Sequence, residues 1–349
     1  MKNWIYILYI GLLGCFTMAC QSSPEEVQLP LGKVQIGFTL ALGDLDSRSR
    51  AEDDWSEVET TTGVIGDSYE NQIDLRNGLQ VLVYSTKNNH YIGKVINPDV
   101  VRQQTENGRV YEFQGDLEID LNYINQDQLS CRLMVFANCA NVTDNNKETL
   151  AFSYDAAYIP MWGVQECTLT LTKGEVSRVP QTIYLLRAMA KVEVKLDAAI
   201  VNDFNLSSVS VDKYNMYGYV LPTYEIGSNT ETLDIESVFN PNETEIGENL
   251  VFTKTADNEF YIYLPEYKNA GEDTTPTSIS VVIDERPYTI EFKNYVSGSA
   301  HGEAYNIIRN HYYQYTITSV NTVENVLIAE LLYQSMPWTD VDNGTLDFN

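Results

Sequence analysis

The stretch TIYLLRAMAKVEVKL, residues 182–196, indicates the fold class of this 349-residue chain. In its second half apolar and charged residues alternate, with Ala190 and Val192 on one side and Lys191 and Glu193 on the other. Strict alternation of this kind is typical of a strand that buries one face. The sequence therefore predicts a β-strand over the second half of this stretch. The first half lacks this strict alternation.

Similar short runs recur along the whole chain. Examples are KVQIGFTLAL (33–42), LQVLVYS (79–85), VYEFQGDLEI (110–119), CRLMVFA (131–137), CTLTLT (167–172), EFYIYLP (259–265) and YYQYTITSV (312–320). Turn-rich pieces such as TENGR and TDNNKE separate them. Many short strands with turns between them favour β-sandwiches, and the length suits two domains. We predict an all-β fold with sandwiches at 31–182 and 183–349; only NQDQLSCRLMV and VLIAELLY are also compatible with a helical turn.

The first residues have the pattern of an export signal. In residues 1–19 the basic Lys2 precedes an apolar stretch that is too short for a membrane-spanning helix. The stretch ends in TMAC, which resembles a bacterial lipobox, although Thr17 stands where leucine is usual. We expect Cys20 to be lipidated and residues 20–30 to form a tether; secretion without a lipid is the alternative.

Charge and cysteine content limit the partners. A formal net charge of −27 argues against nucleic acid and against an anionic membrane surface, because both would repel the chain. Cys131, Cys139 and Cys167 form no CxxC pair and have no neighbouring histidine in the sequence, so no metal site is predicted. Buried thiols on strands are the favoured interpretation, and one disulfide is compatible with it.

The stretch NIIRNHYYQYTITSV, residues 306–320, is the strongest candidate for an active site, since it holds one of only three histidines. Nucleophilic catalysis would need a base set against an activated side chain. The sequence contains no G-x-S-x-G, H-E-x-x-H, Walker or dinucleotide-binding motif. We therefore interpret His311 as a structural residue at the start of a strand, and we predict no enzymatic activity and no cofactor.

Two further patterns receive the same structural interpretation. DVDNGTLD, residues 340–347, lacks one spacer of a calcium loop and its late glutamate, which favours a solvated turn. Trp55, Trp162 and Trp338 could stack on sugars, but core and strand-pair roles are more typical of aromatic residues.

Four stretches together resemble the fimbrillin family, the type V pilins of anaerobic Gram-negative bacteria. They are TMAC (17–20), YLLRAMAKVEV (184–194), IIRNHYYQYTI (307–317) and MPW (336–338). The resemblance implies two transthyretin-like, Greek-key β-sandwich domains and export as an outer membrane lipoprotein. It also implies assembly into a cell-surface fimbrium with other fimbrial subunits.

The family resemblance further implies a route of assembly. An arginine-specific protease would cut after the first strand, within residues 31–50, and a neighbouring subunit would add a strand in its place. In this sequence GDLDSRSRAEDDW follows the strand, so Arg48 and Arg50 are the predicted processing positions. An ordinary loop with two arginines is the alternative.

The resemblance also implies which residues fill the groove in turn. The first strand would fill it with four apolar side chains: Val34, Ile36, Phe38 and Leu40. The donor strand is expected in residues 322–349, where VLIAELLYQSM is apolar on both faces, and its candidate residues are Leu327, Ala329, Leu331 and Tyr333. A monomeric or anchor-type surface lipoprotein, held by the lipid on Cys20 and binding glycans through exposed aromatics, is the alternative function.

Overall fold

The computed structural model describes residues 34–42, 67–75, 78–104, 110–172, 174–233, 237–271, 274, 276–296, 299–321 and 326–335. The expected signal and tether, Cys20, Arg48, Arg50, Trp55 and Trp338 lie outside the described residues. Within them the chain is built of strands, and the all-β prediction is confirmed. The helical pieces in this part of the chain are short: α2 (Asp67–Glu70) and the 3₁₀ turns η1 (Leu121–Tyr123), η2 (Lys147–Thr149) and η3 (Thr230–Thr232). No helix in the described ranges has the length and apolar character to cross a membrane.

The strands of the first part pair into one sheet that closes on itself. They are β1 (Val34–Leu42), β2 (Leu79–Ser85), β3 (Tyr91–Gln104), β4 (Val110–Ile119), β5 (Gln128–Ala137), β7 (Met161–Thr170) and β8 (Val176–Arg187). Their order around the ring is β1-β4-β3-β2-β5-β7-β8, and β8 pairs back onto β1. The two faces of the predicted sandwich are thus joined at their edges. The inner face of this ring is packed with apolar side chains, including Phe38, Phe113, Leu133 and Val135.

The later strands form two sheets that face each other. One sheet has the order β12-β10-β15-β16 and the other β13-β14-β9-β19-β20. The strands are β9 (Met189–Leu196), β10 (Leu206–Asn215), β12 (Ile246–Val251), β13 (Thr253–Ala256), β14 (Glu259–Pro265), β15 (Ser278–Ile283), β16 (Arg286–Glu291), β19 (His311–Asn321) and β20 (Val326–Ser335). A second core lies between these sheets and includes Val192, Val194, Val209, Val281 and Tyr315. Two small sheets complete the fold: β6 (Ala151–Ser153) with β11 (Tyr217–Tyr219), and β17 (Asn294–Val296) with β18 (Ser299–His301).

The observed strands differ from three expectations based on the sequence. The proposed division between residues 182 and 183 falls inside β8, which runs on to Arg187 before β9 begins at Met189. The two stretches that were compatible with helical turns are strands, β5 and β20. The alternation in β9 puts Val192 and Val194 in the core as predicted, but Lys191 and Glu193 on the other face are also buried, at 2% and 1% exposed.

Candidate strand-exchange site

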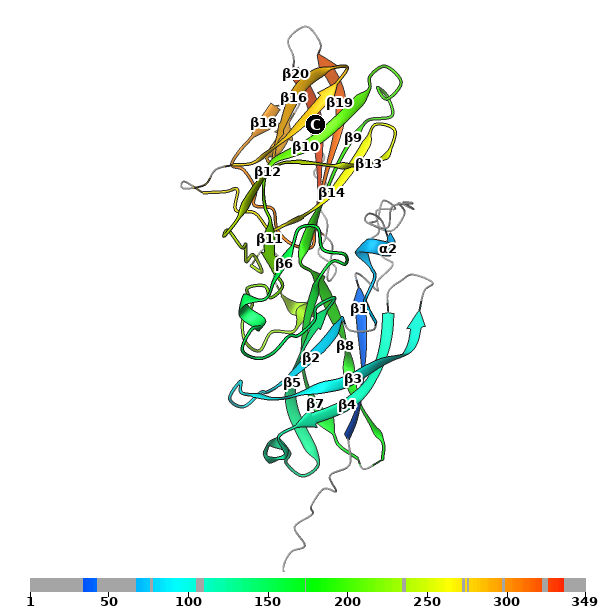
Figure 1. Cartoon of the computed structure of the whole chain (residues 1–349), viewed down its shortest axis with the longest axis vertical. Coiled ribbons are helices and arrows are strands. Elements are labelled where there is room, and N and C mark those ends of the chain that lie inside the picture. Colours follow the sequence, from blue (N-terminus) through cyan, green and yellow to red (C-terminus); the bar gives the residue numbers. More distant parts are fainter. Residues whose placement is uncertain are drawn as a thin grey trace, which may run out of the picture. The chain divides into compact units, whose positions relative to one another are not determined.

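Strand β1 closes the ring, because it pairs with β4 on one side and β8 on the other (Figure 1). It runs antiparallel to β4 over residues 34–41 and parallel to β8 over residues 35–42. Both edges of β1 are therefore hydrogen-bonded. Without it, β4 and β8 would each present an unpaired edge, and such an edge readily pairs with a strand from another chain.

The side chains of β1 supply part of the first core. Ile36, Phe38, Leu40 and Leu42 are 0%, 3%, 0% and 2% exposed, and Val34 is partly buried against the same core. Phe38 lies opposite Phe113 of β4, and their rings stack with centroids 5.6 Å apart and planes 11° apart. The four residues predicted to fill a groove thus lie on or in this core, and Leu42 extends the row.

Strand β8 depends on β1 for most of its pairing. The ladder between them shifts register between Gly37 and Thr39, next to Pro180 of β8, which has no N–H to donate. On its other side, β8 pairs with β7 only at Leu186 and Arg187 among the described residues. Losing β1 would leave β8 attached to the sheet mainly by its pairs with β7 at Leu186 and Arg187.

A segment from far along the chain explains why the β7–β8 ladder is short. Thr230 of η3 is 1% exposed, and its Oγ1 accepts a hydrogen bond from Val164 N (2.5 Å) and donates one to Val164 O (3.0 Å). Asn229 Oδ1 accepts a hydrogen bond from Glu166 N at 2.7 Å. These side chains satisfy backbone groups of β7 that a neighbouring strand would otherwise satisfy. Loss of β1 would therefore leave an unpaired edge on β8, whereas the edge of β7 would stay hydrogen-bonded to Asn229 and Thr230.

A buried polar network holds α2 in place. Glu70 is 0% exposed, and its Oε1 lies 3.0 Å from Lys191 Nζ of β9 and accepts a hydrogen bond from the Tyr263 hydroxyl of β14. Arg187 Nε donates to Glu70 O at 2.9 Å, and its Nη2 donates to Asn71 Oδ1. Glu70 and Asn71 are thus held by side chains from β8, β9 and β14.

The electrostatics of this network explain why its members must be paired. Burial raises the pKa of Glu70, while the charges of Lys191 and Arg187 and the hydrogen bond from Tyr263 act in the opposite direction. Lys191 Nζ also lies 4.6 Å and 5.0 Å from the ring centroids of Tyr261 and Tyr312. Glu70 was not predictable from the sequence, because SYEN (68–71) carries no periodicity and the side chains that contact Glu70 lie more than a hundred residues away.

Strand β20, the predicted donor, lies at an edge of its sheet. It pairs antiparallel with β19 and has no second neighbour in the described sheet. Leu327, Ala329, Leu331 and Tyr333 stand opposite Val320, Ile317, Tyr315 and Tyr313 of β19. The side chains of β20 lie outside what the structure describes, as does the MPW stretch.

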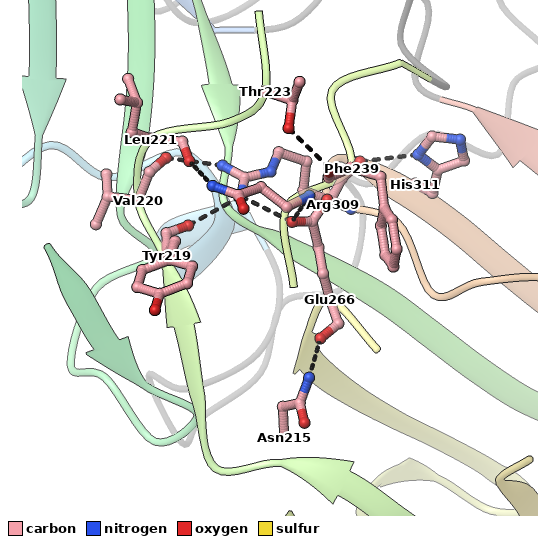
Figure 2. Close-up of polar contacts among 10 residues, drawn as sticks. Asn215, Tyr219, Val220, Leu221, Thr223, Phe239, Glu266, Arg309 and His311 are labelled. Atoms are coloured by element: carbon pink, nitrogen blue, oxygen red, sulfur yellow. Dashed lines mark hydrogen bonds and ion pairs between the residues drawn. The ribbon is translucent and has the colours of Figure 1, made fainter. Parts of the chain in front are cut away.

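The polar stretch at the start of β19 is a structural cluster. Figure 2 shows Arg309, which is 0% exposed, with its guanidinium between Glu266 and two main-chain carbonyls. Its Nη2 lies 2.7 Å from Glu266 Oε2, its Nη1 donates to Val220 O at 2.7 Å, and its Nη2 donates to Tyr219 O at 2.9 Å. The buried charge is thereby neutralised and hydrogen-bonded, as buried charges require. Arg309 ties β11 and the residues after it to the start of β19.

The two residues after Arg309 also have structural positions. Asn310 has a φ of 56°, a conformation that asparagine tolerates well, and its Oδ1 accepts a hydrogen bond from Arg187 N at 3.2 Å. His311 is the first residue of β19, as predicted, and is 0% exposed, with Nδ1 2.8 Å from Arg309 O. Burial lowers the pKa of His311 to about 4.

A pH dependence of stability follows from His311. The unfolded chain binds a proton at this histidine below about pH 6.5, whereas the folded chain keeps it neutral down to about pH 4. The stabilisation is therefore full above pH 6.5 and is lost as the pH falls to 4, about 3 kcal/mol at 1.36 kcal/mol per pKa unit. Urea unfolding at pH 7.5 and 4.5 should show a smaller pH-dependent loss in His311→Gln than in the unchanged protein. Equal losses in both proteins would contradict this origin.

Two observations bear on other kinds of site. Trp162 is 0% exposed and packs against Tyr224, with ring centroids 5.0 Å apart, so it contributes to the core and not to a sugar-binding surface. Among the described residues, no three His, Cys, Asp or Glu side chains are grouped so that they could hold a metal ion.

Comparisons with known proteins agree with this architecture. No protein-family model matches the sequence, and no curated protein matches it. Among solved structures, the tip fimbrial protein Mfa3 from Porphyromonas gingivalis, with a C-terminal truncation, is 14% identical; the match covers 87% of this chain and 99% of that one, with a TM-score of 0.52. A fimbrial assembly protein from Parabacteroides distasonis is 15% identical over 87% of this chain and 100% of that one, with a TM-score of 0.42. At such identities the likeness concerns the fold, and the chain shares its fold with the tip fimbrial protein of Porphyromonas gingivalis.

Proposed function

We propose that this chain is a structural subunit of a cell-surface fimbria, assembled by loss of β1 and replacement of that strand by one from a neighbouring subunit. The observation that carries the proposal is the position of β1. It is paired on both edges, it contributes four side chains that are 3% exposed or less to the core, and the segment after it contains Arg48 and Arg50. The fold shared with a tip fimbrial protein supports the same role.

The energetics of β1 suit a strand that is exchanged rather than discarded. Burying four large apolar side chains is worth about 6–12 kcal/mol at 1.5–3 kcal/mol each. Removing β1 would leave two unpaired edges, at β4 and β8. Only another strand can supply hydrogen-bond partners along the whole length of these edges. A replacement strand needs apolar residues at alternate positions, matching Ile36, Phe38, Leu40 and Leu42.

Strand β20 meets the requirement for a donor in its sequence and in its position. Leu327, Ala329, Leu331 and Tyr333 stand at alternate positions, and the strand has one described neighbour, β19. In this proposal the chain reaches the outer membrane as a lipoprotein, held by Cys20. An arginine-specific protease then releases it from its first strand and its lipid together.

The proposal is tested by removing the two arginines. The double variant Arg48→Ala and Arg50→Ala should keep β1 and fail to form fibres, because the groove stays filled. The matched control is Arg102→Ala, which removes an arginine that is 62% exposed on β3. Fibre formation is measured by electron microscopy of cells and by detergent-resistant polymers on gels. Normal fibres from the double variant would exclude processing at these arginines.

A further inference from the structure

Cys131 and Cys167 face each other across two neighbouring strands. They are direct partners in the antiparallel ladder between β5 and β7, and their Sγ atoms are 3.9 Å apart. Opposite residues in such a ladder have Cα atoms about 4.5–5.5 Å apart, and disulfides span about 4.4–6.8 Å. Rotation about the side-chain bonds can therefore join the two sulfurs without moving the backbone.

The flanking residues hold the two cysteines in register. On one side, Ser130 Oγ lies 3.2 Å from Thr168 Oγ1, and on the other, Arg132 Nε donates to Glu166 Oε1 at 3.0 Å. The ladder continues beyond both pairs, from Gln128 to Ala137 on β5. The cysteines thus stay opposite each other as long as the ring is folded.

The two thiols differ in access and in acidity. Cys131 is 0% exposed, whereas Cys167 is partly exposed. The hydrogen bond from Cys131 lowers the pKa of Cys167, and the same contact together with burial raises the pKa of Cys131. Cys167 is therefore the thiol that can reach and attack an external disulfide.

The third cysteine of this region behaves differently. Cys139 lies beyond the end of β5, and its Sγ donates to Ala137 O at 3.2 Å. Burial raises the pKa of Cys139 to about 12, so little thiolate forms at neutral pH. It provides an internal control for any oxidation of the pair.

We propose that Cys131 and Cys167 form a cross-strand disulfide that joins β5 to β7, made by exchange with a small-molecule or protein disulfide. The Cys167 thiolate attacks one sulfur of the external disulfide, whose S–S bond breaks and releases one thiol. Cys131 then gives up its proton and attacks Cys167 Sγ, which breaks the mixed disulfide and releases the second thiol. The protein loses two protons and two electrons, and the external disulfide is reduced to two thiols.

The bond would strengthen the part of the ring that must persist if β1 is lost. It closes a loop between residues 36 positions apart in the sequence, and loops of this length restrict the unfolded chain substantially. The oxidised protein should therefore unfold at a temperature several degrees higher than the reduced protein. This inference is independent of the proposed fimbrial function.

Peptide mapping of the full chain tests the bond directly, because trypsin separates the three cysteines. Cleavage at lysine and arginine puts Cys131 in peptide 110–132, Cys139 in 133–147 and Cys167 in 148–173. The folded, reduced protein is incubated with oxidised glutathione, unreacted thiols are alkylated under denaturing conditions, and the digest is analysed without reduction. We expect peptide 110–132 linked to 148–173, lighter than their sum by two hydrogen atoms, with Cys139 alkylated.

Three variants test the order of the steps. Cys131→Ser should trap glutathione on Cys167, Cys167→Ser should leave Cys131 as a free thiol, and Cys139→Ser should leave the link unchanged. The proposal is overturned if peptides 110–132 and 148–173 both carry alkylated thiols after oxidation, or if Cys139 is linked as often as either partner. Glutathione on Cys131 instead of Cys167 would overturn the proposed order. The map of the unchanged protein decides the main question even if a variant does not fold.

Discussion

A chain that begins at Ala51 is expected to lose most of its stability as a monomer and to recover it when a first-strand peptide is supplied. The loss should be about 6–12 kcal/mol, which is the burial contributed by the four apolar side chains of β1. Domains of ordinary size are stable by only about 5–15 kcal/mol, so the ring should be close to unfolding or should associate with other copies. Thermal unfolding and size-exclusion chromatography measure both effects.

The matched control for this experiment is a change in the peptide. A synthetic peptide of residues 33–42 should restore the melting temperature of the truncated chain, and the same peptide with Phe38→Asp should not. Phe38 is the residue to change because it is 3% exposed and stacks on Phe113. A truncated chain that stays monomeric and melts as the full chain does would show that β1 is dispensable to the fold.

The second large effect is expected at the buried ion pair between Glu70 and Lys191. Replacing Lys191 with methionine leaves the Glu70 carboxylate buried without the cation 3.0 Å away. Losing one partner of a buried pair typically costs about 3–5 kcal/mol, because the remaining charge is uncompensated. Urea unfolding of Lys191→Met should show a loss of this size.

Two further variants make the result specific to the pair. Lys254→Met removes a lysine from a surface pair with Asp257, whose side chains are 49% and 95% exposed, and should change the free energy of unfolding far less. The double variant Glu70→Gln and Lys191→Met should recover part of the loss, since residue 70 then carries no charge that has lost its lysine partner. A loss in Lys191→Met no larger than that in Lys254→Met would contradict the assigned role.

Strand positions and buried faces were predictable, because they depend on local alternation. Ile36, Phe38 and Leu40 are buried in β1, and Val192 and Val194 are buried in β9, as their spacing indicated. A period of two places alternate side chains on one face whatever the neighbouring strand is. His311 at the start of β19 followed from the same pattern.

Pairing partners were not predictable, because they join distant parts of the chain. No local signal in β1 indicates that it lies parallel to β8, which begins at Val176. Lys191 and Glu193 alternate with apolar residues, which ordinarily indicates an exposed face, yet the network of Glu70, Tyr261 and Tyr312 lies over that face. In sequence, a strand such as β9, whose second face is covered by a buried polar network, has the same alternation as a strand whose second face is exposed to solvent.

The sequence showed which polar residues stand at the start of β19, but not which side chains they contact. Arg309 and Glu266 are 43 residues apart, and a chain with 49 acidic residues offers many carboxylates as candidate partners. The hydrogen bonds that make Arg309 structural go to the main-chain carbonyls of Tyr219 and Val220, which residues of any type could supply. The three-dimensional arrangement was needed to separate a buried structural cluster from an active site.

The mature N-terminus of the protein taken from the cell surface is the most direct test of strand removal. Intact-mass spectrometry of surface material should give chains that begin at Ser49 or Ala51, which are the residues after Arg48 and Arg50. Such a start would mean that the protein is cut after Arg48 or Arg50, which separates β1 from the rest of the chain as strand replacement requires. Chains that begin at a lipidated Cys20 and retain residues 34–42 would contradict it.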